Sequence, residues 1–233
     1  MARDGWKICV ETMVATPTKL STTQQASGEK RVTLHHVSWE GYLQILDALP
    51  QSRGARLTYD QGTLEITMPS EDHEFSLRLI EVFIRILVFE MGMKIKTMGS
   101  TTMNRETLRR GSEPDCAYYI ENQPKVAGRT INFAVDPPPD LVVEVDISHT
   151  DIDKNRFYSG LGVPEFWRYD GQRLRIYCLV DGNYEEREQS PIFPWVTKTD
   201  LYQFLAQAEQ DEIEAERTFR AYVQTQIKPS NQT

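Results

Sequence analysis

One predicted strand constrains this chain more than any other segment, because Asp140-Leu-Val-Val-Glu-Val-Asp-Ile147 sets carboxylates into an otherwise apolar run. Side chains alternate between the two faces of a strand, so Glu144 and Asp146 share a face while the opposite face is apolar. A carboxylate within an apolar strand is costly to bury unless it is paired or holds a cation. The pattern therefore predicts either a cation site on this face or a sheet edge at which Glu144 contacts water.

Asp115 supplies a further carboxylate, at the start of a predicted strand that follows Pro114. If Asp115 lies near Glu144 and Asp146, the three negative charges repel one another unless a positive partner joins them. A hard divalent cation such as Mg²⁺ prefers oxygen ligands of this kind. These carboxylates are therefore candidate ligands of a metal ion.

Strand and helix patterns alternate around these carboxylates. Residues 55–60 and 63–68 flank the short turn Gln61-Gly62 and predict a β-hairpin. The strongest predicted helix spans 71–91, where Ser70 can cap it, acidic residues favour its first turn, and an apolar body indicates burial against a sheet. Other helices are expected after Ser38, over about 151–161, and from Thr199 through Leu205 with an extension to Ile227 left open, and further strands at 94–98, 115–120, 141–147, 165–169, 174–180 and 184–188.

The order of these elements predicts one α/β domain with additions at both termini. Residues 1–31 are expected to be a flexible leader, since 12–31 are rich in Thr, Ser and Gln without periodicity. Residues 32–206 then form the domain, and 207–233 form a helical, acidic extension. A chain of 233 residues is long enough for one sizeable core, whereas two full domains would be cramped.

Composition favours a cytoplasmic protein with no membrane partner. No apolar run approaches the roughly 20 residues of a membrane span. The stretch Met1–Glu11 lacks the features of a secretory signal. Cys9, Cys116 and Cys178 are scattered and show no metal-ligand spacing, so they indicate reduced thiols.

The net charge of −8 argues against a nucleic-acid partner, because proteins that neutralise phosphates usually present a basic face. Part of the excess comes from Glu209-Gln-Asp-Glu-Ile-Glu-Ala-Glu216, which need not lie near any site. A local basic patch is also compatible with an acidic total. Arg105, Arg109 and Arg110 form a basic cluster that either contacts phosphates or solvates a loop.

Five blocks of sequence, taken in order, carry a family resemblance: Tyr59–His73, Glu113–Ile120, Pro137–Ile147, Gly162–Asp170 and Ser190–Trp195. Together they resemble the Uma family of restriction-endonuclease-like proteins, from about Ser38 to Leu205. That family is placed in the PD-(D/E)XK nuclease superfamily. The resemblance therefore implies a central mixed β-sheet flanked by helices, with an N-terminal β-hairpin and a C-terminal helix.

The resemblance also assigns roles position by position. Asp115 matches the aspartate of the family's Pro-Asp strand start, and Glu144 matches the acid of the next strand; both bind the metal ion. Asp146 stands where the superfamily usually has lysine, which is a departure from the motif. Lys154 matches a lysine that the family carries on the following helix. The match implies that its ammonium group enters the same pocket from the helix side; the alternative is an ordinary solvated lysine.

In the implied mechanism Mg²⁺, or Mn²⁺ in its place, binds Asp115 and Glu144, polarises a phosphoryl oxygen and activates a water molecule. Lys154 orients that water or stabilises the transition state. Asp146 either adds a metal ligand or pairs with Lys154.

Two residues at the start of the long predicted helix, His73 and Glu74, complete the candidate set. Superfamily members often supply an extra acid to the site from this place, and Glu74 is the better candidate of the two. We expect His73 to face water.

The resemblance implies an endonuclease that hydrolyses phosphodiester bonds of double-stranded DNA and forms a homodimer, so that two sites cut two strands. A second hypothesis is a protein that keeps the fold without the activity and acts as a binding or regulatory module. Asp146 in place of lysine and the acidic total favour this second hypothesis. A third hypothesis is hydrolysis of a small phosphodiester. Kinship of fold does not by itself decide among the three.

Overall fold

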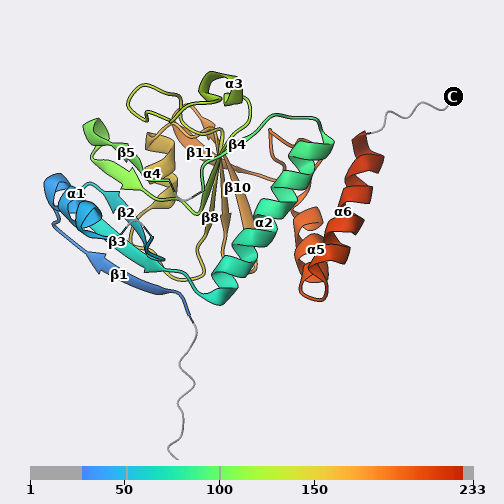
Figure 1. The fold of residues 1–233 in the computed structure, drawn as a ribbon, viewed down its shortest axis with the longest axis horizontal. Coiled ribbons are helices and arrows are strands. Elements are labelled where there is room, and N and C mark those ends of the chain that lie inside the picture. Colours follow the sequence, from blue (N-terminus) through green and yellow to red (C-terminus); the bar gives the residue numbers. More distant parts are fainter. Residues whose placement is uncertain (1–27, 51, 100, 228–233) are drawn as a thin grey trace, which may run out of the picture.

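The computed structural model describes residues 28–50, 52–99 and 101–227, whose strands form two sheets (Figure 1). The first sheet has the strand order β1-β3-β2-β6-β5 and is antiparallel throughout. Its strands are β1 (Lys30–Leu34), β2 (Arg56–Asp60), β3 (Thr63–Met68), β5 (Met103–Arg105) and β6 (Arg110–Ser112). The predicted hairpin is confirmed as β2 and β3.

The second sheet has the strand order β11-β10-β9-β8-β7-β4. Its strands are β4 (Lys96–Thr97), β7 (Cys116–Tyr119), β8 (Leu141–Val145), β9 (Glu165–Tyr169), β10 (Leu174–Val180) and β11 (Asn183–Arg187). Strands β8 and β9 run parallel, whereas the other neighbours run antiparallel. The predicted α/β class with a central mixed sheet is confirmed.

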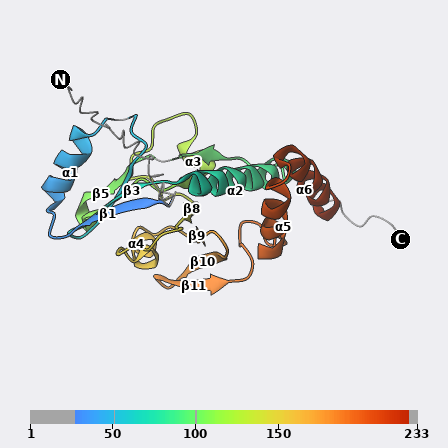
Figure 2. The ribbon, with the colours of Figure 1, turned by 90° about the horizontal axis from the view of Figure 1, so that it is seen from below.

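Helices cover both faces of the second sheet. Figure 2 shows α2 (Glu71–Glu90) and α4 (Lys154–Gly160) on opposite sides of β8 and β9. Helix α1 (Trp39–Ala48) packs on the first sheet, and α3 (Gln123–Val126) lies in the connection between β7 and β8. Within the described ranges, no helix combines the length and the apolarity that a membrane crossing needs.

Strand β8 divides its side chains between two apolar clusters. Leu141, Val143 and Val145 pack in a large core with α2, whereas Val142 packs in a smaller one with α4. This alternation is the one that the sequence predicts. It also directs Glu144 away from α2 and toward α4.

The two ends of the domain differ from the predicted boundaries. The leader was expected to reach Arg31, but Lys30 and Arg31 belong to β1, where they pair with β3. Residues 1–27 lie outside the described part of the chain.

At the other end, the helix that opens near Thr199 is two helices, α5 (Lys198–Ala208) and α6 (Glu212–Ile227), separated by a break before Glu212. Helix α6 buries Phe219 and Val223 in the same core as α2 and α5. It is therefore part of the domain's packing rather than an appendage to it.

Candidate active site

Asp115 and Glu144 lie side by side at the end of the β7–β8 ladder. These strands pair Cys116 with Val143, and the next step of the same register sets Asp115 opposite Glu144. Opposite residues in an antiparallel pair have Cβ atoms about 4.5–5.5 Å apart. Both side chains are buried, each residue being 5% exposed. The structure thus brings two of the predicted site residues together, and the sheet-edge alternative for Glu144 is wrong.

Glu144 accepts hydrogen bonds at one oxygen from two residues of α4. Lys154 Nζ lies 3.0 Å from Glu144 Oε1, and the Tyr158 hydroxyl donates to the same oxygen. Asp153 caps α4, which fixes Lys154 as its first residue and lets the side chain fold back onto β8. The residue is 4% exposed, so Lys154 is not a solvated lysine.

The charge state of this pair follows from its burial. The pKa of Glu144 is raised to about 7, mainly by burial. The positive charge of Lys154 lowers this pKa, whereas the negative charges of Asp115 and Asp146 add to the rise. Burial lowers the pKa of Lys154, but the negative charges of Glu144 and Asp146 outweigh this and leave the pKa raised. Lys154 is therefore a buried ammonium group, placed where negative charge accumulates.

Asp115 has its own positive partners. One carboxylate oxygen accepts a hydrogen bond from the Val145 backbone N–H at 2.7 Å, while the other contacts Arg56 and lies 3.1 Å from His73 Nε2. Burial raises the pKa of Asp115, but the His73 hydrogen bond and the Arg56 charge hold it below its usual value. Asp115 is therefore an ionised carboxylate.

The expectation that His73 faces water is wrong, because the residue is 2% exposed. Its Nδ1 lies 2.9 Å from a Glu29 oxygen and its Nε2 faces Asp115. Burial lowers the pKa of His73, but the two carboxylates raise it to about 9. Glu74, next in α2, is partly exposed and lies 3.0 Å from Arg56. Glu74 therefore reaches Asp115 through the shared Arg56.

Asp146 pairs with arginines rather than with Lys154. Its carboxylate lies 2.9 Å from Arg168 Nε and 3.3 Å from Arg31 Nη2. The predicted alternative of a direct Asp146–Lys154 pair is thus not formed, and the Lys154 ammonium contacts Glu144 instead.

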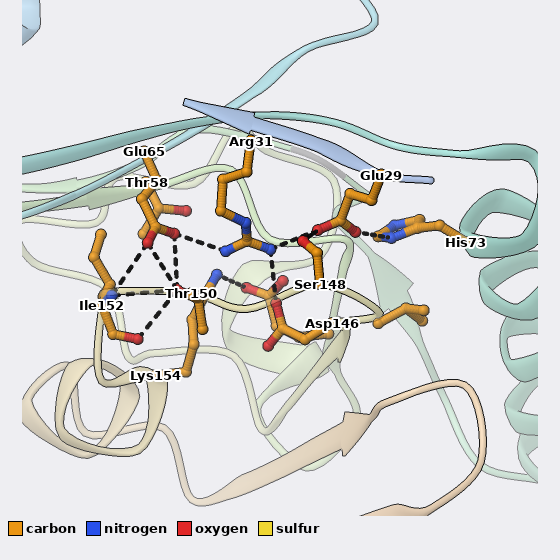
Figure 3. A network of polar contacts seen from close by, with 12 residues as sticks. Glu29, Arg31, Thr58, Glu65, His73, Asp146, Ser148, Thr150, Ile152 and Lys154 are labelled. Atoms are coloured by element: carbon orange, nitrogen blue, oxygen red, sulfur yellow. Dashed lines mark hydrogen bonds and ion pairs between the residues drawn. The ribbon is translucent and has the colours of Figure 1, made fainter. Parts of the chain in front are cut away.

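Sequence reasoning missed the contribution of β1 and the residue before it. Figure 3 shows Arg31 directed from β1 toward Asp146, with Glu29 on one side and Glu65 on the other. Arg31 lies 2.7 Å from both Glu29 and Glu65. Glu65 also accepts hydrogen bonds from the loop before α4, at Thr150 among others. The sequence signal that could have found β1 is the alternation of polar and apolar residues in Lys30-Arg-Val-Thr-Leu34, which is the periodicity of a strand.

The chemistry of the predicted ligands fits a hard divalent cation, since Asp115 and Glu144 are carboxylates on neighbouring strands, close enough for the charge of Asp115 to raise the pKa of Glu144. Each of them, and Asp146, nevertheless has a cationic partner from the chain itself. Among the residues that the structure describes, no three His, Cys, Asp or Glu side chains are grouped so as to hold a metal ion. The site therefore offers a divalent cation two carboxylates, with an ammonium group beside them.

The basic cluster predicted from sequence does not join this site. Arg110 is buried and lies 2.9 Å from Asp60, to which Arg156 also binds. Arg109 adopts a left-handed backbone conformation with φ 49° and is exposed. Arg110 therefore has a structural partner, and phosphate contact remains a prediction for Arg105 and Arg109.

Comparison with known proteins identifies the family of this chain. The Uma2 family model, described as "Putative restriction endonuclease", matches residues 39–210, a range that contains Glu74, Asp115, Glu144, Asp146 and Lys154. A search of curated proteins found no match. The mixed sheet with flanking helices agrees with a restriction-endonuclease-like fold. Because the match covers most of the sequence, this chain belongs to the Uma2 family.

Proposed function

We propose that this protein is a metal-dependent endonuclease that hydrolyses phosphodiester bonds of DNA, with Asp115, Glu144 and Lys154 as its reacting set. One observation carries the proposal. In a chain of the Uma2 family, two adjacent buried carboxylates lie beside a buried ammonium group, with Lys154 Nζ 3.0 Å from Glu144.

In this proposal Asp115 and Glu144 would hold Mg²⁺, with Mn²⁺ as a substitute. When bound, such an ion polarises a phosphoryl oxygen and lowers the pKa of a water molecule. Lys154 offers a positive charge to the negative charge that develops on the phosphoryl group, and burial strengthens that interaction. Tyr158 fixes the orientation of Glu144, and the Val145 N–H fixes that of Asp115.

Glu74 and Asp146 have supporting roles in the proposal. Glu74 shares Arg56 with Asp115, so it adjusts how strongly Arg56 neutralises the Asp115 carboxylate. Asp146 holds Arg31 and Arg168 at the edge of the site, and it becomes a further metal ligand only if those arginines withdraw.

We further propose double-stranded DNA as the substrate, a homodimer as the active assembly and the cytoplasm as the location. The family description supports the substrate, and two strands require two sites. The buried thiols of Cys116 and Cys178 are free, which suits a reducing compartment.

A second candidate is a nuclease-fold protein with weak or no activity that serves as a binding module. The internal pairing of Asp115, Glu144 and Asp146 favours it, as does the net charge of −8. Hydrolysis of a small phosphodiester is compatible with the same acidic surface. A steep salt dependence of binding would separate long DNA from a small substrate.

The direct test is calorimetric titration of Mg²⁺ and Mn²⁺ together with a plasmid-nicking assay. Wild type should bind metal and nick DNA, whereas Glu144→Gln should do neither. Glu165→Gln is the matched control, because Glu165 is a buried carboxylate on the neighbouring strand that bonds to Trp167 instead of a cation; it should retain both properties. Metal binding without nicking of DNA by wild type would favour the binding module.

A further inference from the structure

We infer that β1 is a latch on the candidate site: Arg31 occupies the carboxylate cluster as an internal cation, and a divalent ion binds in competition with it. The inference rests on the proposed metal site. It adds a conformational step, the release of β1, that the proposed function does not require.

The charges of the cluster nearly cancel without any external ion. Five basic side chains contact five buried carboxylates. A divalent cation added to this set would leave an excess of buried positive charge, which is costly in a medium of low polarity. Metal binding should therefore displace a cation of the chain. The carboxylates are Glu29, Glu65, Asp115, Glu144 and Asp146, and the basic side chains are Arg31, Arg56, His73, Lys154 and Arg168.

Arg31 is the cation whose departure disturbs the fold least. It lies on an edge strand that pairs only with β3, whereas Arg56 and Arg168 lie on interior strands, and His73 and Lys154 lie on packed helices. Val32 and Leu34 of β1 are 50% and 40% exposed, so little apolar burial holds the strand down. Segments of this kind open at low free energy.

The contacts of Arg31 also fit a removable group. Its guanidinium bridges Glu29, Glu65 and Asp146, so one movement removes a cation from three carboxylates. Among the described residues, Arg31 Nε is buried without a hydrogen-bond partner, which lowers the cost of withdrawing the side chain.

Glu29, which precedes β1, has partners besides Arg31 on the Asp115 side of the site. Glu29 bonds to His73 and to the Ser148 hydroxyl, and His73 in turn faces Asp115. These contacts would hold Glu29 in place when Arg31 withdraws, so the cluster would lose a positive charge without losing a negative one. The Uma2 match begins at residue 39, so the latch lies outside the matched segment.

The test combines calorimetry with hydrogen exchange on the full chain. Arg31→Met should bind Mn²⁺ about tenfold more tightly than wild type, and Mn²⁺ should speed exchange of the 30–34 amides in wild type by a similar factor, because coupling between two equilibria is reciprocal. Arg31→Lys keeps the charge and should stay near wild type.

Arg168→Met is the matched control, because it removes another cation of Asp146 without touching β1. Mn²⁺ should still speed β1 exchange in this variant, whereas in Arg31→Met exchange should be fast with or without metal. Unchanged β1 exchange in wild type with Mn²⁺ bound would overturn the latch and leave the nuclease proposal standing. If Arg31→Met binds Mn²⁺ more tightly but neither protein nicks DNA, the latch stands and the nuclease proposal fails. If neither protein binds Mn²⁺ at millimolar concentration, both fail.

Discussion

Glu144 and Lys154 form a buried ion pair in which each residue depends on the other. The pair is enclosed by α4 and β8, and Tyr158 supplies the additional hydrogen bond. Loss of one member of such a pair leaves an uncompensated buried charge, whereas loss of both does not. The contribution of this pair to folding can therefore be separated from its contribution to chemistry.

Lys154→Met should lower the free energy of unfolding by about 3–5 kcal/mol, because Glu144 loses its buried cation. The double variant Glu144→Gln, Lys154→Met should recover most of this loss. Urea denaturation of the four proteins in the cycle measures both effects. Additive losses in the double variant would mean that the pair is not coupled.

Glu165 provides a residue-scale test of pH dependence. Burial raises its pKa, although hydrogen bonds such as that from Trp167 oppose the shift. A raised pKa in the folded state gives stability that is complete below the unfolded pKa and is lost as pH rises. The stability of Glu165→Gln relative to wild type should therefore improve from pH 4 to pH 8. A constant difference in thermal denaturation across that range would contradict the assignment.

Residue by residue, the sequence could indicate only part of the site. Asp115, Glu144 and Lys154 follow from local patterns and the family resemblance. Arg31 could not be found this way, because its partner Asp146 lies 115 positions away and ion pairs of that separation leave no local periodicity. His73 was misjudged for the same reason, since Glu29 and Asp115 come from distant segments.

Among the elements, long periodic segments were predictable and short ones were not. Helix α2 and the β2–β3 hairpin have enough residues to show their periods. Strands β5 and β6 have three residues each, too few for alternation to register. The boundary between α5 and α6 was also missed, because both flanks are rich in helix-forming residues.

Helix α6 should prove essential to the stability of the domain. Phe219 stacks on Phe83 of α2 with ring centroids 4.3 Å apart and is 5% exposed. Phe219→Ala should therefore lower the free energy of unfolding by about 3–5 kcal/mol, as expected for an aromatic core truncation. Chemical denaturation tests this. Ile213→Ala is the control, since Ile213 is on the same helix but 57% exposed. Equal effects of both substitutions would show that α6 does not close the core.

At the scale of the whole molecule, the cluster joins the two sheets. Arg31, Arg56 and Glu65 come from the first sheet, while Asp115 and Asp146 flank strands of the second. The ion pairs between them link sheets that share no ladder hydrogen bonds among the described strands. The site and the junction between the sheets are therefore the same set of side chains.

Removal of divalent metal ions by a chelator should abolish activity but leave thermal stability almost unchanged. Because the chain's own cations neutralise most of the cluster, EDTA should abolish DNA nicking yet change the Tm by no more than about 2 °C. Scanning calorimetry with and without EDTA measures the second effect. A large loss of Tm on chelation would show that an external ion, rather than Arg31 and Lys154, holds the cluster together.

The edge position of β1 has a further consequence for association between molecules. When β1 leaves, β3 becomes the outer strand, and its backbone N–H and C=O groups lose the partners that β1 supplies at Leu64 through Met68. An uncovered edge of this kind is a template for strand addition by another chain. The only charged side chain that β3 carries is Glu65, which would then lack Arg31 and oppose such pairing. The residue that helps to hold the latch closed would thus also act as a gatekeeper against self-association while it is open.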